Sequence, residues 1–128
     1  MIIICLTRLT FRLDLMFKPK IKWHRIGDYD DIYHQISDKK PKHFDVMGHD
    51  VVLCKKEDGI LVAMKDKCPH HGKKLSDGWC EDNRIVCPYH QFSFDLDTGM
   101  GCGTGVDTYE LEKRDQELFI GITKVSFF

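Results

Sequence analysis

The sequence predicts an all-β fold, an antiparallel β-sandwich or barrel. Short runs of β-type residues recur along the chain and are separated by turn-forming Gly and Asp residues. Apart from one short segment, no stretch shows the sustained apolar spacing of a helix. A chain of 128 residues is long enough for one domain with its own core and too short for two ordinary domains.

The predicted elements begin with a strand at residues 22–26. Residues 30–36 form one or two predicted helical turns, because Asp residues open the segment. The remaining predicted strands are residues 44–47, 50–54, 60–64, 84–86, 91–96, 108–111 and 118–122. Gly48-His49 and Glu57-Asp58-Gly59 are the predicted hairpin connections, since Asp-Gly is a strong hairpin signal.

Glycines alternate with other residues between positions 99 and 105. The surrounding sequence lacks the strand–glycine–helix context that a phosphate-binding loop requires. We therefore predict a flexible loop in this region.

The balance of charges argues against several classes of function. The net charge is −1 and 30% of the residues are charged, without the excess of Lys and Arg typical of nucleic-acid binding. No run approaches the roughly 20 apolar residues that cross a bilayer. We therefore expect a soluble cytoplasmic protein with no nucleic-acid partner and no membrane partner.

We interpret residues 1–21 as an N-terminal extension and residues 22–128 as the domain itself. Residues 1–6 are apolar, but no basic residue precedes them and no small-residue cleavage site follows them, so they make a poor secretory signal. Met16 is an alternative start, in which case residues 1–15 would not belong to the protein.

Six cysteines in a chain without a clear secretory signal indicate a reducing compartment. Paired Cys and His residues then favour metal binding over disulfides. Cysteines outside such pairs are predicted to pack as small apolar residues. These are Cys5, Cys54, Cys80 and Cys102.

Two short Cys/His pairs form the most specific pattern in the sequence. Cys68-x-His70 and Cys87-x-x-His90 are separated by the 16 residues between His70 and Cys87. Pro follows the Cys in both pairs and stiffens each loop at the same place. A structural zinc site is one interpretation, although zinc motifs usually place two Cys together and two His together. The mixed order suits a binuclear iron–sulfur cluster, in which one iron takes thiolates and the other takes imidazoles.

This stretch resembles the signature of Rieske [2Fe–2S] proteins, Cys-x-His, 16 or 17 residues, then Cys-x-x-His. The resemblance extends to Leu75-Ser76-Asp77-Gly78, to Cys87-Pro88-Tyr89-His90, and to Phe94-Asp95-Leu96-Asp97-Thr98-Gly99. It is most specific over residues 68–99 and covers about residues 22–123. The first and the last of these motifs look most like those of soluble Rieske-type ferredoxins that serve dioxygenases, whereas Cys87-Pro88-Tyr89-His90 is also similar to oxygenase chains.

The resemblance implies a base domain of antiparallel strands with a small cluster-binding subdomain. It also implies one [2Fe–2S] cluster per chain, with Cys68 and Cys87 on one iron and His70 and His90 on the other. His71 matches no ligand position, and we interpret it as a neighbouring or surface residue.

Two departures from the high-potential members of the family imply a low reduction potential. Those members have a disulfide between the ligand loops, at positions that match Lys73 and Tyr89 here. They also place hydroxyl groups beside the cluster, at positions that match Phe92 and Phe94. Without hydrogen bonds from such hydroxyls, we expect a potential near the bottom of the family's range of about −150 to +300 mV.

The expected function is a one-electron carrier between a flavoprotein reductase and a terminal oxygenase. Two redox alternatives are the small subunit of an NAD(P)H nitrite reductase and the N-terminal Rieske module of a truncated oxygenase. A structural zinc-binding β-domain is the non-redox alternative. We expect no catalysis by this chain alone, because no mononuclear iron domain follows Phe128. The remaining histidines are read as ordinary surface or core residues: His24, His34, His43 and His49.

Two further departures concern the region after the second ligand loop. Family members often have a Pro-containing loop there, whereas residues 99–109 contain no Pro. Many members also have Gly after the second ligand His, where this chain has Gln91.

Overall fold

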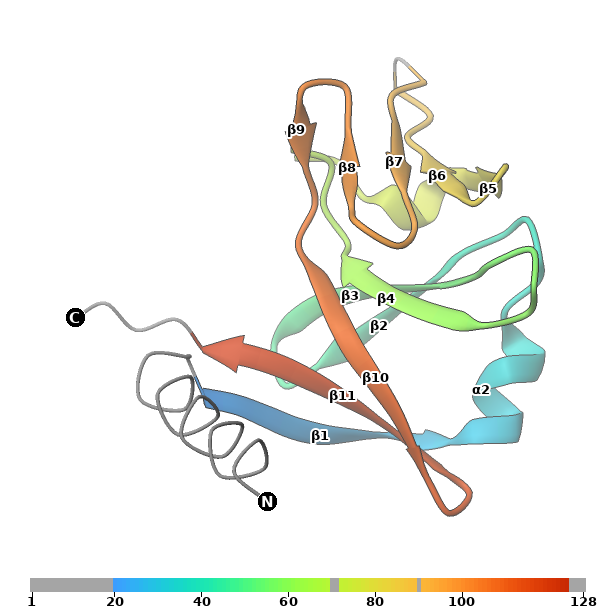
Figure 1. Cartoon of the computed structure of the whole chain (residues 1–128), viewed down its shortest axis with the longest axis vertical. Coiled ribbons are helices and arrows are strands. Elements are labelled where there is room, and N and C mark those ends of the chain that lie inside the picture. The colour runs from blue at the N-terminus through green and yellow to red at the C-terminus, as the bar shows by residue number, and fades with distance from the viewer. Residues whose placement is uncertain (1–19, 70–71, 90, 125–128) are drawn as a thin grey trace, which may run out of the picture.

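Two antiparallel sheets and a short hairpin make up the β structure of the described residues, which confirms the all-β prediction (Figure 1). The computed structural model describes residues 20–69, 72–89 and 91–124. The larger sheet has six strands in the order β1-β11-β10-β4-β3-β2, and the smaller sheet has the order β5-β6-β7. The small sheet and the β8–β9 hairpin lie together at one end of the molecule (Figure 1).

The elements of the larger sheet come from both ends of the described chain. They are β1 (Lys20–Asp28), β2 (Lys42–Val46), β3 (His49–Lys55), β4 (Leu61–Lys65), β10 (Thr108–Arg114) and β11 (Glu117–Lys124). The smaller elements lie between β4 and β10. They are the 3-10 turn η1 (Leu75–Asp77), β5 (Trp79–Glu81), β6 (Arg84–Val86), β7 (Ser93–Asp95), β8 (Met100–Gly101) and β9 (Thr104–Gly105).

The predicted helical turns are confirmed as helix α2 (Tyr29–Gln35). Asp28 caps this helix, because its side chain accepts a hydrogen bond from the backbone N–H of Asp31 at 3.1 Å. Ile32 and Ile36 bury the inner face of the segment. The helix therefore closes one side of the core inside the larger sheet.

Strands β3 and β4 are buried on both faces and separate two apolar cores. Val51 and Leu53 point into the core beneath α2, whereas Val52 and Cys54 point towards the small sheet. This alternation follows from the two-residue period of a strand. We call the core between the two sheets the intersheet core. Its buried members are Val52, Cys54, Met64, Cys68, Leu75, Cys80, Ile85, Cys87, Phe94, Leu96 and Val106.

Polar contacts also join the small sheet to the larger one. The backbone N–H of Cys80 donates to the carbonyl of Lys39 at 2.8 Å. The backbone N–H of Glu57 donates to the side chain of Asn83 at 2.8 Å. The small sheet is therefore held by backbone contacts as well as by apolar packing.

The glycine-rich segment is a tight hairpin, so the prediction of a flexible loop there is wrong. Met100 pairs with Gly105, and Gly101 pairs with Thr104. A side chain at Gly101 would overlap the backbone carbonyl of Ser93, so only glycine allows β8 to pass so close to β7. The alternating glycines thus serve close packing.

The packing prediction for the unpaired cysteines is confirmed at two positions and wrong at a third. Cys54 and Cys80 are buried, as expected. Cys102 is exposed, because it lies in the β8–β9 turn with a φ of +52°. Cys5 lies outside the described residues. The described part of the chain contains no helix long and apolar enough to cross a membrane.

Candidate metal centre

The two cysteines of the Cys/His motif open two loops that are closed in the same way. The backbone N–H of Cys68 donates to the carbonyl of Lys73 at 2.7 Å. The backbone N–H of Cys87 donates to the carbonyl of Phe92, also at 2.7 Å. In each loop the accepting residue is the fifth after the Cys, so the two loops have the same backbone hydrogen-bonding pattern.

The turn that closes each loop needs a left-handed residue at the fourth position after its Cys. Gly72 fills that position in the first loop with a φ of +67°, and Gln91 fills it in the second with a φ of +58°. Glycine adopts this conformation without strain, whereas a residue with a side chain adopts it at a cost. The second loop is therefore strained at Gln91, where many family members have Gly.

The thiols of Cys68 and Cys87 meet in the intersheet core. Both residues are 0% exposed and belong to the same core, and the Cys68 thiol is near enough to Cys87 to influence its pKa. Burial raises the pKa of the Cys87 thiol, and the neighbouring Cys68 thiol raises that pKa further. The fold thus brings together two soft ligands that lie 19 positions apart in the sequence, as one iron ion would require.

The other two predicted ligands, His70 and His90, lie outside the described residues, as does His71. Their assignment remains a prediction from the motif. Each described loop nevertheless leads into one of these histidines, and each loop begins at one of the paired thiols.

A buried carboxylate anchors the start of the first loop. Asp66, which is 3% exposed, is the one buried charged side chain among the described residues. It accepts hydrogen bonds from the backbone N–H and the hydroxyl of Ser76, at 2.8 and 2.6 Å. The ring nitrogen Nδ1 of His43 lies 2.7 Å from the same carboxylate. Because Cys68 follows two residues later, these contacts fix the loop to η1 and β2.

Ser76 belongs to the sequence motif, but nothing in the motif predicts its contact with Asp66 or the contact of Asp66 with His43. An Asp between two lysines, in Lys65-Asp66-Lys67, looks like an ordinary surface residue. Its position two residues before the first ligand Cys was the available signal.

Gly78 allows η1 to pack directly beneath the second loop. A side chain at this position would overlap the backbone carbonyl of Val86, and it would approach Pro88 at 3.2 Å. The Gly of the Leu75–Gly78 motif is therefore required for packing.

The positions that a disulfide joins in high-potential relatives are also neighbours here. The ammonium of Lys73 lies 5.5 Å from the centre of the Tyr89 ring, a cation–π contact between the two loops. Phe94 is fully buried and Phe92 packs against the intersheet core. The loops are thus held together by non-covalent contacts of these described residues.

Comparison with known families identifies the class of this site. Residues 22–108 match the family model of the Rieske [2Fe–2S] domain. The chain belongs to this family, and its cofactor is a [2Fe–2S] cluster. Two adjacent buried thiols, in loops that each continue to a His of the motif, fit such a cluster.

Curated relatives include both electron carriers and oxygenases. The ferredoxin subunit of a 3-phenylpropionate/cinnamic acid dioxygenase from Photorhabdus laumondii is 36% identical over 72 residues, covering 52% of this chain and 69% of the relative. A 4beta-methylsterol monooxygenase from Methylococcus capsulatus is 34% identical over 73 residues, covering 57% of this chain. This chain spans only 18% of that monooxygenase, and between 16% and 19% of the other oxygenases among the first relatives.

Solved structures with the same fold include a dioxygenase ferredoxin and a nitrite reductase subunit. The ferredoxin of carbazole 1,9a-dioxygenase from Nocardioides aromaticivorans has a TM-score of 0.66 and 26% identity, covering 77% of this chain and 96% of that one. A chain assigned as the small subunit of an NADH-dependent nitrite reductase from Mycobacterium tuberculosis has a TM-score of 0.69. Its 19% identity, over 83% of this chain and 99% of that one, shows the fold alone.

Proposed function

We propose that this chain carries single electrons from a flavoprotein reductase to a terminal oxygenase. The meeting of two buried thiols in matching loops carries this proposal, because it brings together half of a Rieske ligand set. The proposed ligands are Cys68, His70, Cys87 and His90. When bound, the cluster supplies a site that gains and loses one electron.

The surroundings of the thiols support a low reduction potential. Phe92 and Phe94 stand where high-potential relatives have hydroxyl groups, and a phenyl ring donates no hydrogen bond to a cluster sulfur. Ser93 lies between them, but strand alternation turns its side chain to the opposite face from Phe94, where its hydroxyl accepts a hydrogen bond from Arg84 Nε at 2.9 Å. We therefore expect the oxidised cluster to be favoured over the reduced cluster, which corresponds to a low reduction potential.

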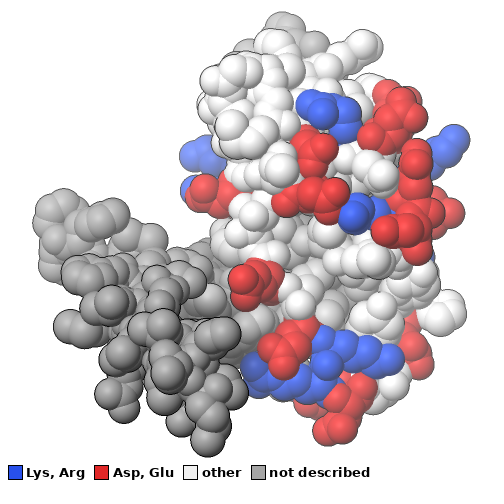
Figure 2. Space-filling model, in the orientation of Figure 1, with Lys and Arg blue, Asp and Glu red and all other residues white. Residues whose placement is uncertain are grey.

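The tips of the two loops are the proposed docking face for redox partners. Tyr89 is 43% exposed beside the proposed ligand His90. The nearby Lys73 contributes a positive charge. On the view in Figure 2, the end of the molecule that carries the β8–β9 hairpin bears few charged side chains. A partner that combines an apolar patch with a carboxylate would fit such a face.

The relatives support a free carrier more directly than the other redox alternatives. The Photorhabdus ferredoxin subunit is matched over 69% of its own length, whereas each oxygenase is matched over less than a fifth. Identity to the oxygenases nevertheless favours one second candidate, the Rieske module of a larger oxygenase. In either case we propose that residues 22–128 transfer electrons and do not themselves activate oxygen.

Reconstituted electron transfer tests the carrier function. The probe is an NADH-dependent flavoprotein reductase together with an oxygenase component that requires a ferredoxin. Added in trans, the purified protein should accept one electron per chain from the reductase and restore product formation by the oxygenase. If the protein is reduced but no ferredoxin-dependent oxygenase accepts its electron, it is not a mobile carrier. That result would favour the second candidate, the Rieske module of a larger oxygenase.

Adjacent histidines provide a matched pair of variants for the same assay. His70→Ala should abolish reduction of the protein by the reductase, because it removes a proposed ligand. His71→Ala should leave reduction largely intact, because His71 matches no ligand position. Equal loss in the two variants would contradict the ligand assignment.

A further inference from the structure

Two cysteines outside the proposed cluster site face each other across the two sheets. Cys54 lies on β3 of the larger sheet and Cys80 lies on β5 of the smaller sheet. They are 0% and 3% exposed and belong to the same intersheet core. Each thiol is the largest single influence on the pKa of the other, so the two side chains are neighbours. Disulfide formation needs two thiols in close approach, and the fold places these two side chains in one core from opposite sheets.

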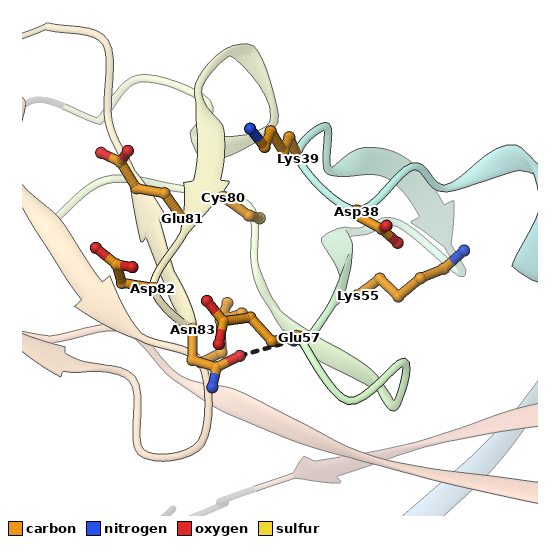
Figure 3. Close-up of a pocket in the computed structure, with 9 residues that line it drawn as sticks. Asp38, Lys39, Lys55, Glu57, Cys80, Glu81, Asp82 and Asn83 are labelled. Carbon is orange, nitrogen blue, oxygen red and sulfur yellow. Dashed lines mark hydrogen bonds between the residues drawn. The ribbon is translucent and has the colours of Figure 1, made fainter.

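Cys80 has a route to solvent through a pocket of about 420 Å³. Its side chain points from β5 towards the middle of the residues that line this pocket (Figure 3). Charged residues of both signs line it, two basic and four acidic: Lys39, Lys55, Asp38, Glu57, Glu81 and Asp82. Since Cys80 itself is almost fully covered, only a small reagent can reach its sulfur.

The two thiols are electrostatically unequal. The hydrogen bond from Cys54 lowers the pKa of Cys80, and the positive charge of Lys40 lowers it further, although burial acts in the opposite direction. The pKa of Cys54 is raised, first by its hydrogen bond with Cys80 and then by burial. Because Cys80 lines the pocket and Cys54 is fully buried behind it, Cys80 is the thiol that a reagent meets first, and Cys54 is the resolving thiol.

We propose that Cys54 and Cys80 form a redox-active pair, which a small peroxide oxidises to a disulfide that joins the two sheets. The Cys80 thiolate attacks one peroxide oxygen, the O–O bond breaks, and water leaves after protonation. Cys54 then attacks the resulting sulfenic sulfur, the S–S bond forms and a second water leaves. The two thiols lose two electrons in total, and one hydrogen peroxide gains them.

The disulfide would enclose the first ligand loop in a covalent ring. Residues 54–80 form this ring, which contains Cys68 and His70. A cross-link of this kind limits how far the residues between the two cysteines can unfold. Oxidation should therefore slow the release of iron from the holoprotein, whatever redox partner the protein serves.

Peptide mapping of the holoprotein tests the pair without any substitution. Trypsin releases Cys54 in peptide 43–55 and Cys80 in peptide 75–84, and each peptide contains one cysteine. After one equivalent of hydrogen peroxide, a catalase quench and alkylation in denaturant, we expect these peptides joined with the loss of two hydrogens. Dithiothreitol should separate them again, and the cluster absorbance should persist through the peroxide step, before the denaturant is added.

Two results would overturn the proposal. Both peptides could remain fully alkylated while the exposed Cys102 is oxidised, which would show that peroxide does not reach the pair. Alternatively, the cross-link could join Cys68 to Cys87, which would show that peroxide acts only by destroying the cluster site.

Variants test the effect on the ligand loop. In the wild-type protein and in the control Cys102→Ala, prior oxidation should lengthen the half-time of iron release to a chelator by about tenfold. In Cys54→Ala, oxidation should leave that half-time unchanged. An equal effect in all three proteins, or no effect in the wild type, would refute the restraint of the loop by this disulfide. If Cys54→Ala fails to fold, the peptide map of the wild-type protein still tests the disulfide. The half-times of iron release in the wild type and in Cys102→Ala still test its effect on the loop.

Discussion

Gln91 holds the second ligand loop in a conformation that suits glycine better. Its φ of +58° mirrors the φ of +67° at Gly72 in the first loop. We predict that Gln91→Gly raises the free energy of unfolding by about 1 kcal/mol, because it removes left-handed strain. Chemical denaturation measures the change. Gly72→Ala is the matched control and should lower stability by a similar amount, whereas a loss of stability in Gln91→Gly would contradict the strain.

Ser76 supplies two of the hydrogen bonds that satisfy the buried carboxylate of Asp66. Ser76→Ala keeps the backbone donor but removes the hydroxyl, leaving part of a buried charge without its partner. We predict a loss of about 1–3 kcal/mol in the free energy of unfolding, measured by denaturant titration. Ser37→Ala is the control, because the hydroxyl of Ser37 caps an exposed turn, and it should cost less. Equal effects would show that the Asp66 contacts do not stabilise the loop.

At the residue scale, the sequence predicted the thiol pair but not the carboxylate beneath it. Cys68 and Cys87 belong to a motif whose chemistry is specific to their residue types and spacing. Asp66 acquires its role only through burial beside Ser76 and His43, which come from different elements. Such a role depends on tertiary packing, and the only sign of it in the sequence is that Asp66 lies two residues before Cys68.

The turn after β7 is held by one aspartate side chain. Asp95 accepts hydrogen bonds from the backbone N–H groups of Asp97 and Thr98 at 2.8 and 3.0 Å. Those bonds lower the pKa of Asp95. Since the folded-state pKa lies below the unfolded value, this carboxylate stabilises the fold above its ordinary pKa of about 4, and the effect fades as the pH falls through the lowered pKa.

We therefore predict that Asp95→Asn is less stable than the wild type at pH 7, and that the difference shrinks below about pH 4. The measurement is denaturant unfolding of both proteins at steps from pH 7 to pH 3. Comparing the two proteins cancels the loss of the cluster in acid, which affects both. A difference that stays constant down to pH 3 would show that the ionised carboxylate does not hold this turn.

At the element scale, the strands with strong β-type composition were predictable and the short ones were not. The predicted strand 84–86 coincides with β6, and the runs at 50–54 and 60–64 correspond to β3 and β4. In contrast, β5 was missed and the predicted strand 91–96 is reduced to β7. Left-handed Gln91 and the Asp95 turn shorten β7 at its two ends. Both causes are local backbone geometry that residue type alone does not specify.

The whole molecule separates two tasks between its two sheets. The six-stranded sheet, closed by α2, supplies most of the apolar packing, and the small sheet presents the ligand loops at one end (Figure 1). The base domain and the cluster-binding subdomain implied by the family resemblance are both present in this arrangement. What the sequence could not specify is how the subdomain is attached, because that depends on contacts such as the one between Glu57 and Asn83.

The reduction potential is a property of this whole arrangement. With Phe at positions 92 and 94 and no disulfide between the loops, we predict a midpoint below zero, towards the lower limit of about −150 mV. Protein-film voltammetry of the holoprotein measures it. A midpoint well above zero would mean that other donors reach the cluster sulfurs.

EPR spectroscopy of the dithionite-reduced protein, with iron and acid-labile sulfide assayed on the same sample, tests the central claim most directly. The proposed four-ligand site predicts a Rieske-type signal and about two irons and two sulfides per chain. A silent spectrum with one zinc per chain would contradict the account and leave a structural metal domain in its place.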